Sequence, residues 1–513
     1  MFSRTWSATT IGVDAIPVEV EAHLRGGLPK WTVVGLPDGA VRESRDRVAA
    51  AIKNSDLPLH RGAVTVNLAP ADVRKEGSSF DLPFALAIIT AFIHAHDAER
   101  FDELLFVGEL SLDGAVRPVR GVLPVAVCAK QEGRRGVVVP VENAAEAAVV
   151  EGIEVYAVST LRQAFRLLVD GRGEQYTRVE RPRTVGAVDG ADWADVRGQE
   201  GVKRALEVAA AGGHNALMVG PPGSGKTMLA RRLPTILPSL STEEALETTK
   251  IHSVSGKLNG ESGHGLVTER PFRAPHHTIS DAGLCGGGSN PMPGEISLAH
   301  NGVLFLDELP EFRRQVLEVM RQPLEEGQIT IARARMTVAY PSRFMLIASM
   351  NPCPCGHLND PTRACVCAPP QVQRYLARLS GPLLDRIDLH VEVTPVPFEE
   401  LRRRQPGETS ETVRQRVMVA RERQAERFAE SDGIHCNAQM TTRMVRRHAA
   451  LDPAGEQLLR TAIDRLGLSA RAYDRILKVA RTIGDLAGAD RVAPEHLAEA
   501  IQYRSLDRGW WGG

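Results

Sequence analysis

Short continuous apolar runs stand out along the middle of the chain and predict buried strands. Positions 216–219, 303–306 and 344–350 are apolar at nearly every residue, as in the buried strands of a parallel sheet. Glycine, acidic or amide residues follow these runs directly. Because open α/β sheets bind ligands at the carboxyl ends of their strands, we expect the functional side chains at this edge.

The first third of the chain shows both strand and helix periods. Positions 63–68 alternate as in a strand, and positions 42–53 follow a helical spacing, so an α+β domain is expected. The longest apolar run, Leu82 to Ile93, includes Pro83 and is too short to cross a bilayer. No apolar signal segment follows the first four residues, so we expect a cytoplasmic protein without a membrane partner.

The pattern beyond Pro397 is helical. Pro494 begins a last predicted helix, and an apolar stripe marks the helix before it. That stripe consists of Ile476, Val479, Ala480, Ile483 and Leu486. The expected division is an α+β domain at 1–173, a linker at 174–190, an α/β core at 191–396 and a helical lid domain at 397–513.

Composition adds one constraint on the partners. The chain has 513 residues with a formal net charge of −1, so it has no overall basic field that would attract nucleic acid. Any contact with DNA must therefore be local, in a channel or a hairpin. The length exceeds that of one ordinary domain, in agreement with the several regions expected from the pattern.

The segment after the run 216–219 predicts a nucleotide phosphate site. It matches G-x-x-x-x-G-K-[ST], in which glycines let backbone N–H groups converge on the phosphates. Lys226 supplies a charge to the β- and γ-phosphates, and the hydroxyl of Thr227 is a ligand for Mg²⁺. ATP or GTP with Mg²⁺ is therefore the expected ligand. The loop comprises Gly220, Pro221, Pro222, Gly223, Ser224, Gly225, Lys226 and Thr227.

Polar residues at the ends of the next two strands complete a hydrolytic site. Asp307 and Glu308 follow the run 303–306, and Asn351 follows the run 344–350. Asp307 is expected to hold Mg²⁺, Glu308 to polarise the attacking water and Asn351 to reach the γ-phosphate. Solvated acids at a strand end and a turn asparagine before Pro352 are the alternatives.

Two segments of the core are candidates for contact with a substrate. Residues 328–338 predict a hairpin on which Arg333 and Arg335 share a face, and these arginines would contact DNA phosphates without reading sequence. A solvated edge strand is the alternative. The Gly-rich stretch 272–288 is expected to be a mobile substrate loop. Its adjacent His276 and His277 point apart on a strand and do not suggest a shared metal.

Four of the seven cysteines are clustered in the pattern C-x-C-x9-C-x-C, directly after Asn351. Four thiolates around one Zn²⁺ would hold this loop rigidly beside the ATP site. The usual zinc spacing is C-x2-C, so four reduced cysteines in a tight loop remain the alternative. The candidate ligands are Cys353, Cys355, Cys365 and Cys367.

The order of these motifs, continued by the segment 383–388, resembles an AAA+ ATPase. The subclass resembles that of magnesium-chelatase I subunits and MCM helicases. This resemblance implies that Arg386 is an arginine finger acting on ATP of the neighbouring subunit, and that Arg471 is the second sensor. An ion pair of Arg386 with Asp385 or Asp388, and a solvated Arg471, are the alternatives. A finger acting in trans implies a head-to-tail ring, and the family resemblance implies a hexamer.

The N-terminal region is similar to the proteolytic domain of Lon, which has a ribosomal S5 domain 2-like fold. The segment 75–79 corresponds to the nucleophile segment of that family and places Ser79 at the catalytic serine. The catalytic lysine of the family falls at Leu123, and a leucine cannot accept the serine proton. We therefore expect no peptidase activity, and a scaffold or a nucleic-acid-binding face in its place.

Nearly the whole chain resembles the YifB/ComM family of magnesium-chelatase-like AAA+ ATPases. The resemblance rests on the Lon-like domain, the chelatase-type core, the paired C-x-C motifs and the helical lid. It implies a ring ATPase that acts on branched or single-stranded DNA, with helicase or branch-migration activity in recombination or natural transformation. A magnesium-chelatase motor and a protein-remodelling ATPase are the alternatives.

Overall fold

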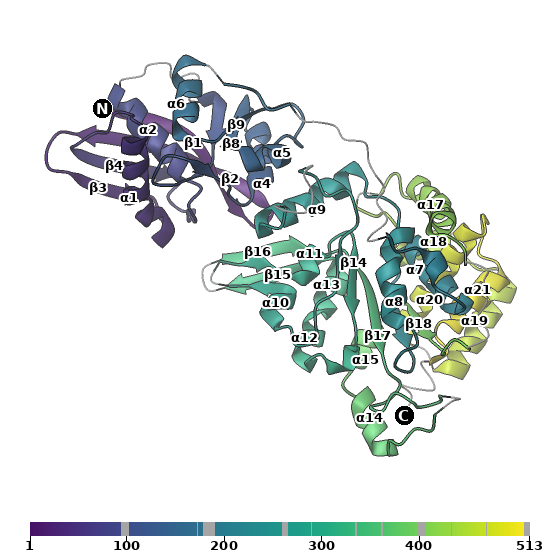
Figure 1. The fold of residues 1–513 in the computed structure, drawn as a ribbon. Coiled ribbons are helices and arrows are strands. Elements are labelled where there is room, and N and C mark those ends of the chain that lie inside the picture. Colours follow the sequence, from purple (N-terminus) through teal and green to yellow (C-terminus); the bar gives the residue numbers. More distant parts are fainter. Residues whose placement is uncertain are drawn as a thin grey trace.

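Figure 1 shows an elongated chain with one sheet at the N-terminal end, a second sheet in the middle and a group of helices at the C-terminal end. The computed structural model describes residues 1–93, 102–171, 173–177, 190–258, 265–288, 290–333, 336–360, 363–397, 407–431, 433–467 and 469–506.

The N-terminal sheet has seven strands in the order β3-β4-β2-β1-β5-β8-β9, with β1, β2 and β4 antiparallel and the other pairs parallel. The expected α+β pattern is thus present, and the apolar run 82–93 is a buried helix. The strands of this sheet are β1 (Phe2–Ile11), β2 (Asp14–Arg25), β3 (Lys30–Val34), β4 (Ala63–Ala69), β5 (Leu104–Phe106), β8 (Gly136–Pro140) and β9 (Glu154–Val158). Strands β6 (Glu109–Leu110) and β7 (Val116–Arg117) form a separate antiparallel pair. The helices are α1 (Gly39–Asn54), α2 (Asp81–Ile93), α4 (Val122–Gln131), α5 (Ala144–Ala147) and α6 (Leu161–Asp170).

The start of the predicted linker belongs to this sheet region. The backbone N–H of Tyr176 donates to the carbonyl of Val155 over 2.7 Å, and Gln175 forms a bridge with Tyr156. Residues 174–176 therefore pair with β9, whereas 178–189 lie outside the described residues.

The central sheet is parallel, as the apolar runs predict, with the order β11-β14-β17-β10-β18. Its strands are β10 (Ala216–Val219), β11 (Phe272–Arg273), β14 (Val303–Leu306), β17 (Met345–Met350) and β18 (Leu389–Glu392). Two hairpins stand beside it, β12 (Gly286–Gly287) with β13 (Met292–Pro293), and β15 (Gln328–Arg333) with β16 (Met336–Pro341). The helices are α7 (Glu200–Gly212), α8 (Lys226–Arg232), α9 (Thr242–Ser255), α10 (Asp281–Cys285), α11 (Glu295–Leu298), α12 (Arg314–Val319), α13 (Arg321–Glu326), α14 (Pro369–Leu376) and α15 (Gly381–Leu384).

The C-terminal region is helical, as predicted. Its helices are α17 (Ser410–Arg427), α18 (Thr442–His448), α19 (Pro453–Leu466), α20 (Ala470–Leu486) and α21 (Pro494–Gln502). The predicted stripe is buried at Ile476, Val479, Ala480 and Ile483, in one apolar cluster with Leu206 of α7. The helices are thus attached to the central sheet through α7.

The contacts between the N-terminal region and the central one include an ion pair of Asp14 with Lys250 on α9 (3.1 Å) and two further places. The N–H of Gly121 donates to the carbonyl of Ser253 at the end of α9 (3.1 Å), and the Ser253 hydroxyl donates to the buried carboxylate of Glu146 (2.6 Å). At the second place, Ile11 and Val13 of the β1–β2 turn pack on the apolar cluster that contains Val338 of β16.

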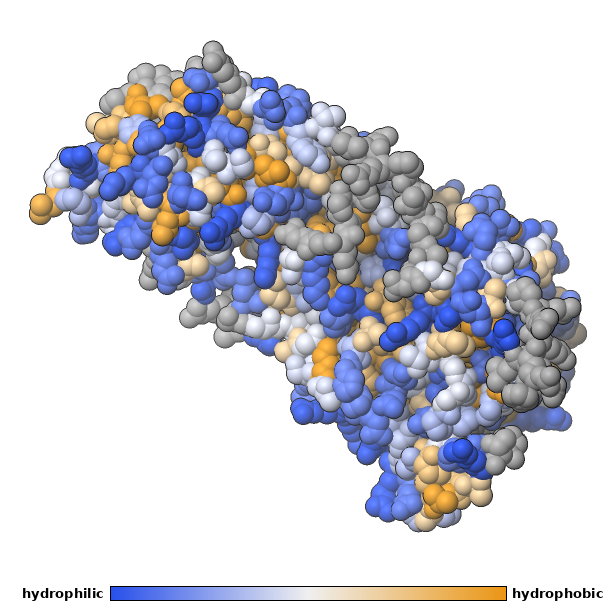
Figure 2. All heavy atoms as spheres, in the orientation of Figure 1, coloured by the Kyte–Doolittle hydropathy of each residue, from blue (hydrophilic) through white to orange (hydrophobic). Residues whose placement is uncertain are grey.

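Hydrophilic residues predominate on the face of the molecule drawn in Figure 2, with apolar residues in small groups between them. Within the described ranges, no helix has the length and hydropathy needed to span a membrane.

Candidate functional site

The predicted phosphate loop joins the end of β10 to the start of α8, so its backbone lies at the carboxyl edge of the central sheet. Gly223 and Gly225 have φ values of 76° and 88°, which favour glycine. A Cβ at Gly220 would lie 2.2 Å from the carbonyl oxygen of Val393. The glycines are therefore required by the backbone geometry that presents N–H groups to an anion.

Lys226 is the first residue of α8, and its ammonium group is held within the loop. Its Nζ donates to the carbonyls of Gly220 (2.7 Å) and Pro221 (2.8 Å) and lies 3.4 Å from the amide oxygen of Asn351. Burial lowers the pKa of Lys226 to about 8, against the opposing effect of Asp307. The structure thus brings the predicted lysine, acid and asparagine together.

Asp307 lies at the centre of a hydrogen-bond network. The Thr227 hydroxyl donates to its Oδ2 over 2.7 Å, and its Oδ1 accepts bonds from the Ser349 hydroxyl and the Glu308 N–H. A hydroxyl next to a carboxylate is an oxygen donor set that Mg²⁺ accepts. Ser349 was missed by sequence reasoning, although a single polar residue inside an apolar run was the available signal.

Glu308 adopts a left-handed backbone conformation with φ 54°, unusual for a residue with a side chain. Its carboxylate Oε2 lies 3.5 Å from Nδ1 of His277, whose ring packs edge-on against Phe312. The rings of His276 and His277 lie 4.1 Å apart and neither residue is in a strand, so the prediction that they point apart on a strand is wrong. Phe272 begins edge strand β11, and His277 belongs to the candidate site.

Gln199 joins the loop to the neighbouring strand. Its Nε2 donates to the carbonyl of Ser224 (2.6 Å) and to that of Thr394 (3.2 Å) just after β18. Its backbone is also left-handed, with φ 58°. The sequence predicts that the segment 195–199 begins the core, but no motif in this segment predicts the hydrogen bonds of Gln199.

Arg386 lies at the opposite edge of the same sheet. Its carbonyl accepts a bond from the side chain of Asn215 (3.0 Å), the residue before β10, whereas the phosphate loop follows β10. Four strand residues separate the two edges by roughly 13 Å at about 3.3 Å per residue. Arg386 and Lys226 therefore lie near opposite ends of β10.

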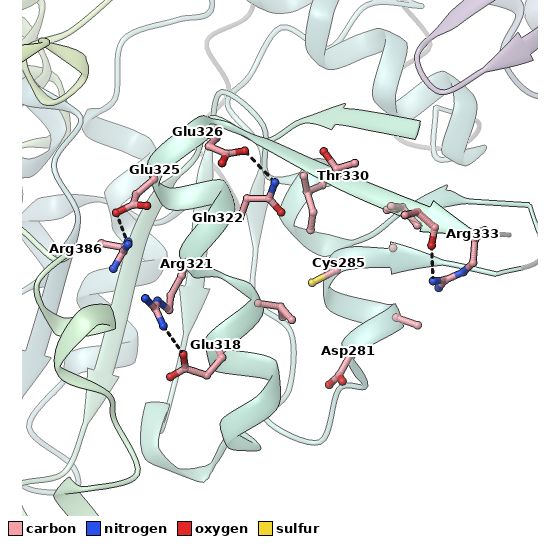
Figure 3. A pocket seen from close by; sticks show the side chains of 16 residues that line it. Asp281, Cys285, Glu318, Arg321, Gln322, Glu325, Glu326, Thr330, Arg333 and Arg386 are labelled. Carbon is pink, nitrogen blue, oxygen red and sulfur yellow. Dashed lines mark hydrogen bonds and ion pairs between the residues drawn. The ribbon is translucent and has the colours of Figure 1, made fainter. Parts of the chain in front are cut away.

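The guanidinium of Arg386 is buried and bonds to the carboxylate of Glu325 and the carbonyl of Pro382 (Figure 3). Its partner is thus neither Asp385 nor Asp388, the two acids considered from sequence. Burial lowers the pKa of Arg386, and the nearby charges of Arg321 and Arg471 lower it further.

Arg471, on α20, is exposed and lies near Arg386. Asp388 instead pairs with Arg475, one turn further along this helix. The two predicted arginines of the core and the lid are therefore brought together, away from the phosphate loop.

The predicted hairpin exists as β15 and β16, paired in register up to Arg333 and Met336. Ile331 and Val338 are buried on one face, while the exposed Arg333 donates to the Gly288 carbonyl (3.4 Å) of the adjacent hairpin. Arg335 lies outside the described residues, so its predicted common face with Arg333 is untested.

The four clustered cysteines converge on one point. The Sγ atom of Cys353 lies 3.4 Å from that of Cys355 and 3.7 Å from that of Cys365, and all four sulfurs, with Cys367, lie within 4.8 Å of one another. Sulfurs placed tetrahedrally at about 2.3 Å from Zn²⁺ would be about 3.8 Å apart, so the donor set fits this ion.

The cysteine loop touches the phosphate loop. A Cβ at Gly356 would lie 2.5 Å from Cδ of Pro222, so a side chain there would displace one of the two loops. Hydrogen bonds from the backbone N–H groups of His357 and Val366 lower the pKa of Cys355 to about 6, which favours a thiolate.

Ser79 and Leu123 occupy different surroundings in the N-terminal region. Ser79 lines a cavity of about 330 Å³, whereas Leu123 is fully buried in the core. Arg120 supplies a cation to the cavity lining, but no lysine does so among the described residues. The buried amine of Lys75 donates to the carbonyls of Leu68 and Pro70. The described residues thus place the carboxylates of Glu76 and Glu109, but no lysine amine, around the cavity that Ser79 lines.

Comparison with known proteins identifies the family. The model described as magnesium chelatase, subunit ChlI, matches residues 192–401, a second described as subunit ChlI of Mg-chelatase matches 20–143, and its C-terminal model matches 407–504. The protein YifB of Escherichia coli is 46% identical over 97% of this chain and 96% of its own. Competence protein ComM of Haemophilus influenzae is 44% identical over 98% and 97%. The chain belongs to the YifB/ComM family of magnesium-chelatase-like AAA+ ATPases.

Membership of the YifB/ComM family accounts for the parallel sheet with its phosphate loop and for the C-terminal helices. Lon protease 2 of Bacillus subtilis is 32% identical over 126 residues, 24% of this chain and 21% of its own. This shorter match covers too little of either chain to carry an activity.

Proposed function

We propose that the protein is a ring-forming ATPase that couples ATP hydrolysis to the remodelling of DNA. The observation that carries the proposal is the position of Arg386 and Lys226 at opposite edges of one sheet. A single subunit then has a phosphate loop on one side and a buried arginine on the other. Head-to-tail association places the arginine of one subunit beside the phosphate loop of the next. In a closed ring, every phosphate loop then has such an arginine. The family resemblance favours a hexamer.

In this proposal the loop N–H groups and Lys226 bind the triphosphate of ATP, and Thr227 and Asp307 hold Mg²⁺, which neutralises phosphate charge when bound. Water attacks the γ-phosphorus while Glu308 accepts its proton, and the bond from that phosphorus to the bridging oxygen breaks to leave ADP. Asn351 orients the γ-phosphate. Arg386 of the neighbouring subunit, with Arg471 near it, stabilises the charge that develops on the leaving oxygen.

DNA is the proposed substrate because the hairpin supplies a positive group repeated around the ring. Arg333 is exposed at the end of β15, and Arg335 follows it in the sequence. Repeated in each subunit of the ring, these arginines would contact successive phosphates of the DNA backbone without sequence specificity. The similar protein from Haemophilus influenzae is named a competence protein. The proposal therefore includes branch migration of incoming DNA, with the protein acting in the cytoplasm.

We also propose that Cys353, Cys355, Cys365 and Cys367 hold a structural Zn²⁺, supported by the fit of their sulfur positions. The N-terminal region is proposed to be a Lon-like scaffold without peptidase activity, supported by the buried leucine at position 123.

The test is ATP-dependent strand release from a fluorescently labelled branched DNA, with Lys226→Ala as the control. Release by the wild type and none by the variant supports the proposal. ATP hydrolysis that leaves branched and linear DNA unchanged would favour the second candidate, a magnesium-chelatase-like motor or a protein-remodelling ATPase that acts on a protein partner. Its support is the match to chelatase subunit models over both the core and the C-terminal helices.

A further inference from the structure

A cavity of about 720 Å³ opens beside Arg386, between α10, α12, α13 and the β15–β16 hairpin. Figure 3 shows the ion pairs Arg386–Glu325 and Arg321–Glu318 at one end of the cavity, with Arg333 at the other end. The acids are Asp281, Glu318, Glu325 and Glu326, and the cations are Arg321, Arg333 and Arg386. Arg386, which lines this cavity, lies at the edge of the sheet away from the phosphate loop, and the proposed function turns Arg386 toward a neighbour.

The guanidinium of Arg386 is only partly hydrogen-bonded in this cavity. Its side chain is 4% exposed and pairs with Glu325, yet its Nε is buried without a hydrogen-bond partner among the described residues. A buried N–H without an acceptor costs free energy, because the group has lost its hydrogen bonds to water. The position therefore suits an arginine that receives a further anionic ligand.

Arg321, the first residue of α13, has the same incomplete pairing. Its Nη1 lies 2.9 Å from the carboxylate of Glu318, and its Nε is also buried without a partner in the described part of the chain. Its charge acts on Arg386 closely enough to lower the pKa of that residue. Two guanidinium groups that repel each other thus line one cavity.

The two acids that balance these arginines can move into water. The side chains of Glu325 and Glu318 are 49% and 33% exposed. A triphosphate carries more negative charge than one carboxylate and presents several oxygens to a guanidinium fork. It can therefore replace both carboxylates without leaving either acid buried and unpaired.

We propose that Arg321 is a second arginine that contacts the γ-phosphate of ATP bound by the neighbouring subunit, beside Arg386. Glu318 and Glu325 hold the two guanidinium groups in place in a subunit that has no neighbour on this side. This inference rests on the proposed ring, and it adds a catalytic residue that the sequence motifs did not identify.

The experiment measures steady-state ATPase activity of Arg321→Ala, Arg386→Ala and the control Arg162→Ala. Arg162 is 43% exposed and pairs with one carboxylate, close to the 40% exposure of Arg321, but lies in the N-terminal region. We expect kcat to fall roughly 10- to 100-fold in Arg321→Ala, since one preorganised donor to a transition state is worth this order. Arg162→Ala should retain wild-type turnover.

Mixing tests whether Arg321 acts in trans. Arg321→Ala has an intact phosphate loop, and Lys226→Ala has intact arginines, so a mixed ring contains some complete interfaces. At equal amounts and with random assembly, roughly a quarter of the interfaces are complete, and about that share of wild-type activity should return. If Arg321 only stabilises its own subunit, the mixture gives no such rescue. Arg321→Lys preserves the charge and serves as a second variant in case Arg321→Ala fails to fold.

The outcomes separate the two proposals. If Arg386→Ala is not rescued by Lys226→Ala, the ring arrangement itself is wrong. If Arg386→Ala is rescued while Arg321→Ala alone has wild-type turnover or is not rescued, the ring stands and the role of Arg321 is overturned. Rescue of both variants supports the inference.

Discussion

Nδ1 of His277 lies 3.5 Å from the carboxylate Oε2 of Glu308, and the two residues come from segments about thirty positions apart. Glu308 is exposed and has a left-handed backbone, so its side chain depends on this neighbour for its direction. The contact links the proposed general base to edge strand β11, which leads into the segment that carries the histidine.

Replacement of His277 by alanine should lower kcat for ATP several-fold while the KM for ATP changes little, because Glu308 would lose its orientation and no phosphate contact is removed. Steady-state ATPase measurements test this. His60→Ala is the control, since His60 lies in the N-terminal region and bonds to the carbonyl of Arg25, whereas the ring of His276 packs on that of His277 at 4.1 Å. Equal effects of the two substitutions would contradict the proposed role.

Affinity for ATP should depend on the charge of Lys226. Because burial lowers its pKa to about 8, the amine of the free protein is protonated below pH 8 and loses its charge as the pH rises above it. The dissociation constant should therefore rise above pH 8, by up to about tenfold per pH unit. Titration with a fluorescent ATP analogue between pH 7 and 9.5 measures it. Lys226→Arg stays charged, and its affinity should lack this dependence.

The cysteine cluster should carry about one zinc ion per chain, measured by metal analysis of the purified protein. Cys365→Ser should lose the metal, and a strong chelator should remove it from the wild type. Both should weaken ATP binding, because Gly356 of this loop packs against Pro222. Cys128→Ser, which alters a single buried cysteine in the N-terminal region, is the control. Wild-type protein without zinc would show that the cluster is a set of reduced thiols.

The contact between Glu146 and Ser253 should contribute to the stability of the joined regions. Ser253→Ala removes one donor from a buried carboxylate, whose pKa burial already raises. The free energy of unfolding should fall by about 1–3 kcal/mol, measured by urea denaturation. Ser255→Ala is the matched control, since that hydroxyl bonds only within its own helix end. A loss of the same size in both variants would show that the interface bond contributes nothing.

The contribution of Glu146 to the free energy of unfolding should also depend on pH. The folded-state pKa of Glu146 is raised, so the charged carboxylate is disfavoured by folding at neutral pH and this cost disappears below its unfolded pKa of about 4.5. Glu146→Gln, which keeps one acceptor and carries no charge, should remove this contribution between acidic and neutral pH.

The parts of the site that come from contiguous sequence could be predicted, whereas most of their partners could not. The phosphate loop and Asp307 follow apolar runs, and strand geometry alone places them at one edge. His277 contacts Glu308 and Glu325 contacts Arg386, and each pair joins segments that are far apart in the sequence. Neither hydrophobic periodicity nor a local motif predicts which distant residues will meet. Strand β11 has two residues, too few to show alternation, and the polar, Gly-rich composition of the stretch around it predicts a mobile substrate loop.

The turn between β1 and β2 has a mechanical consequence. A Cβ at Gly12 would lie 2.8 Å from Cγ1 of Val338, so the N-terminal sheet rests on the arm of β16 with no space between them. Close-packed contacts transmit displacement instead of absorbing it. Movement of that arm during ATP turnover must therefore shift the N-terminal sheet or break this contact. In the proposed ATPase, the N-terminal region is thus coupled mechanically to the β15–β16 hairpin for as long as this contact holds.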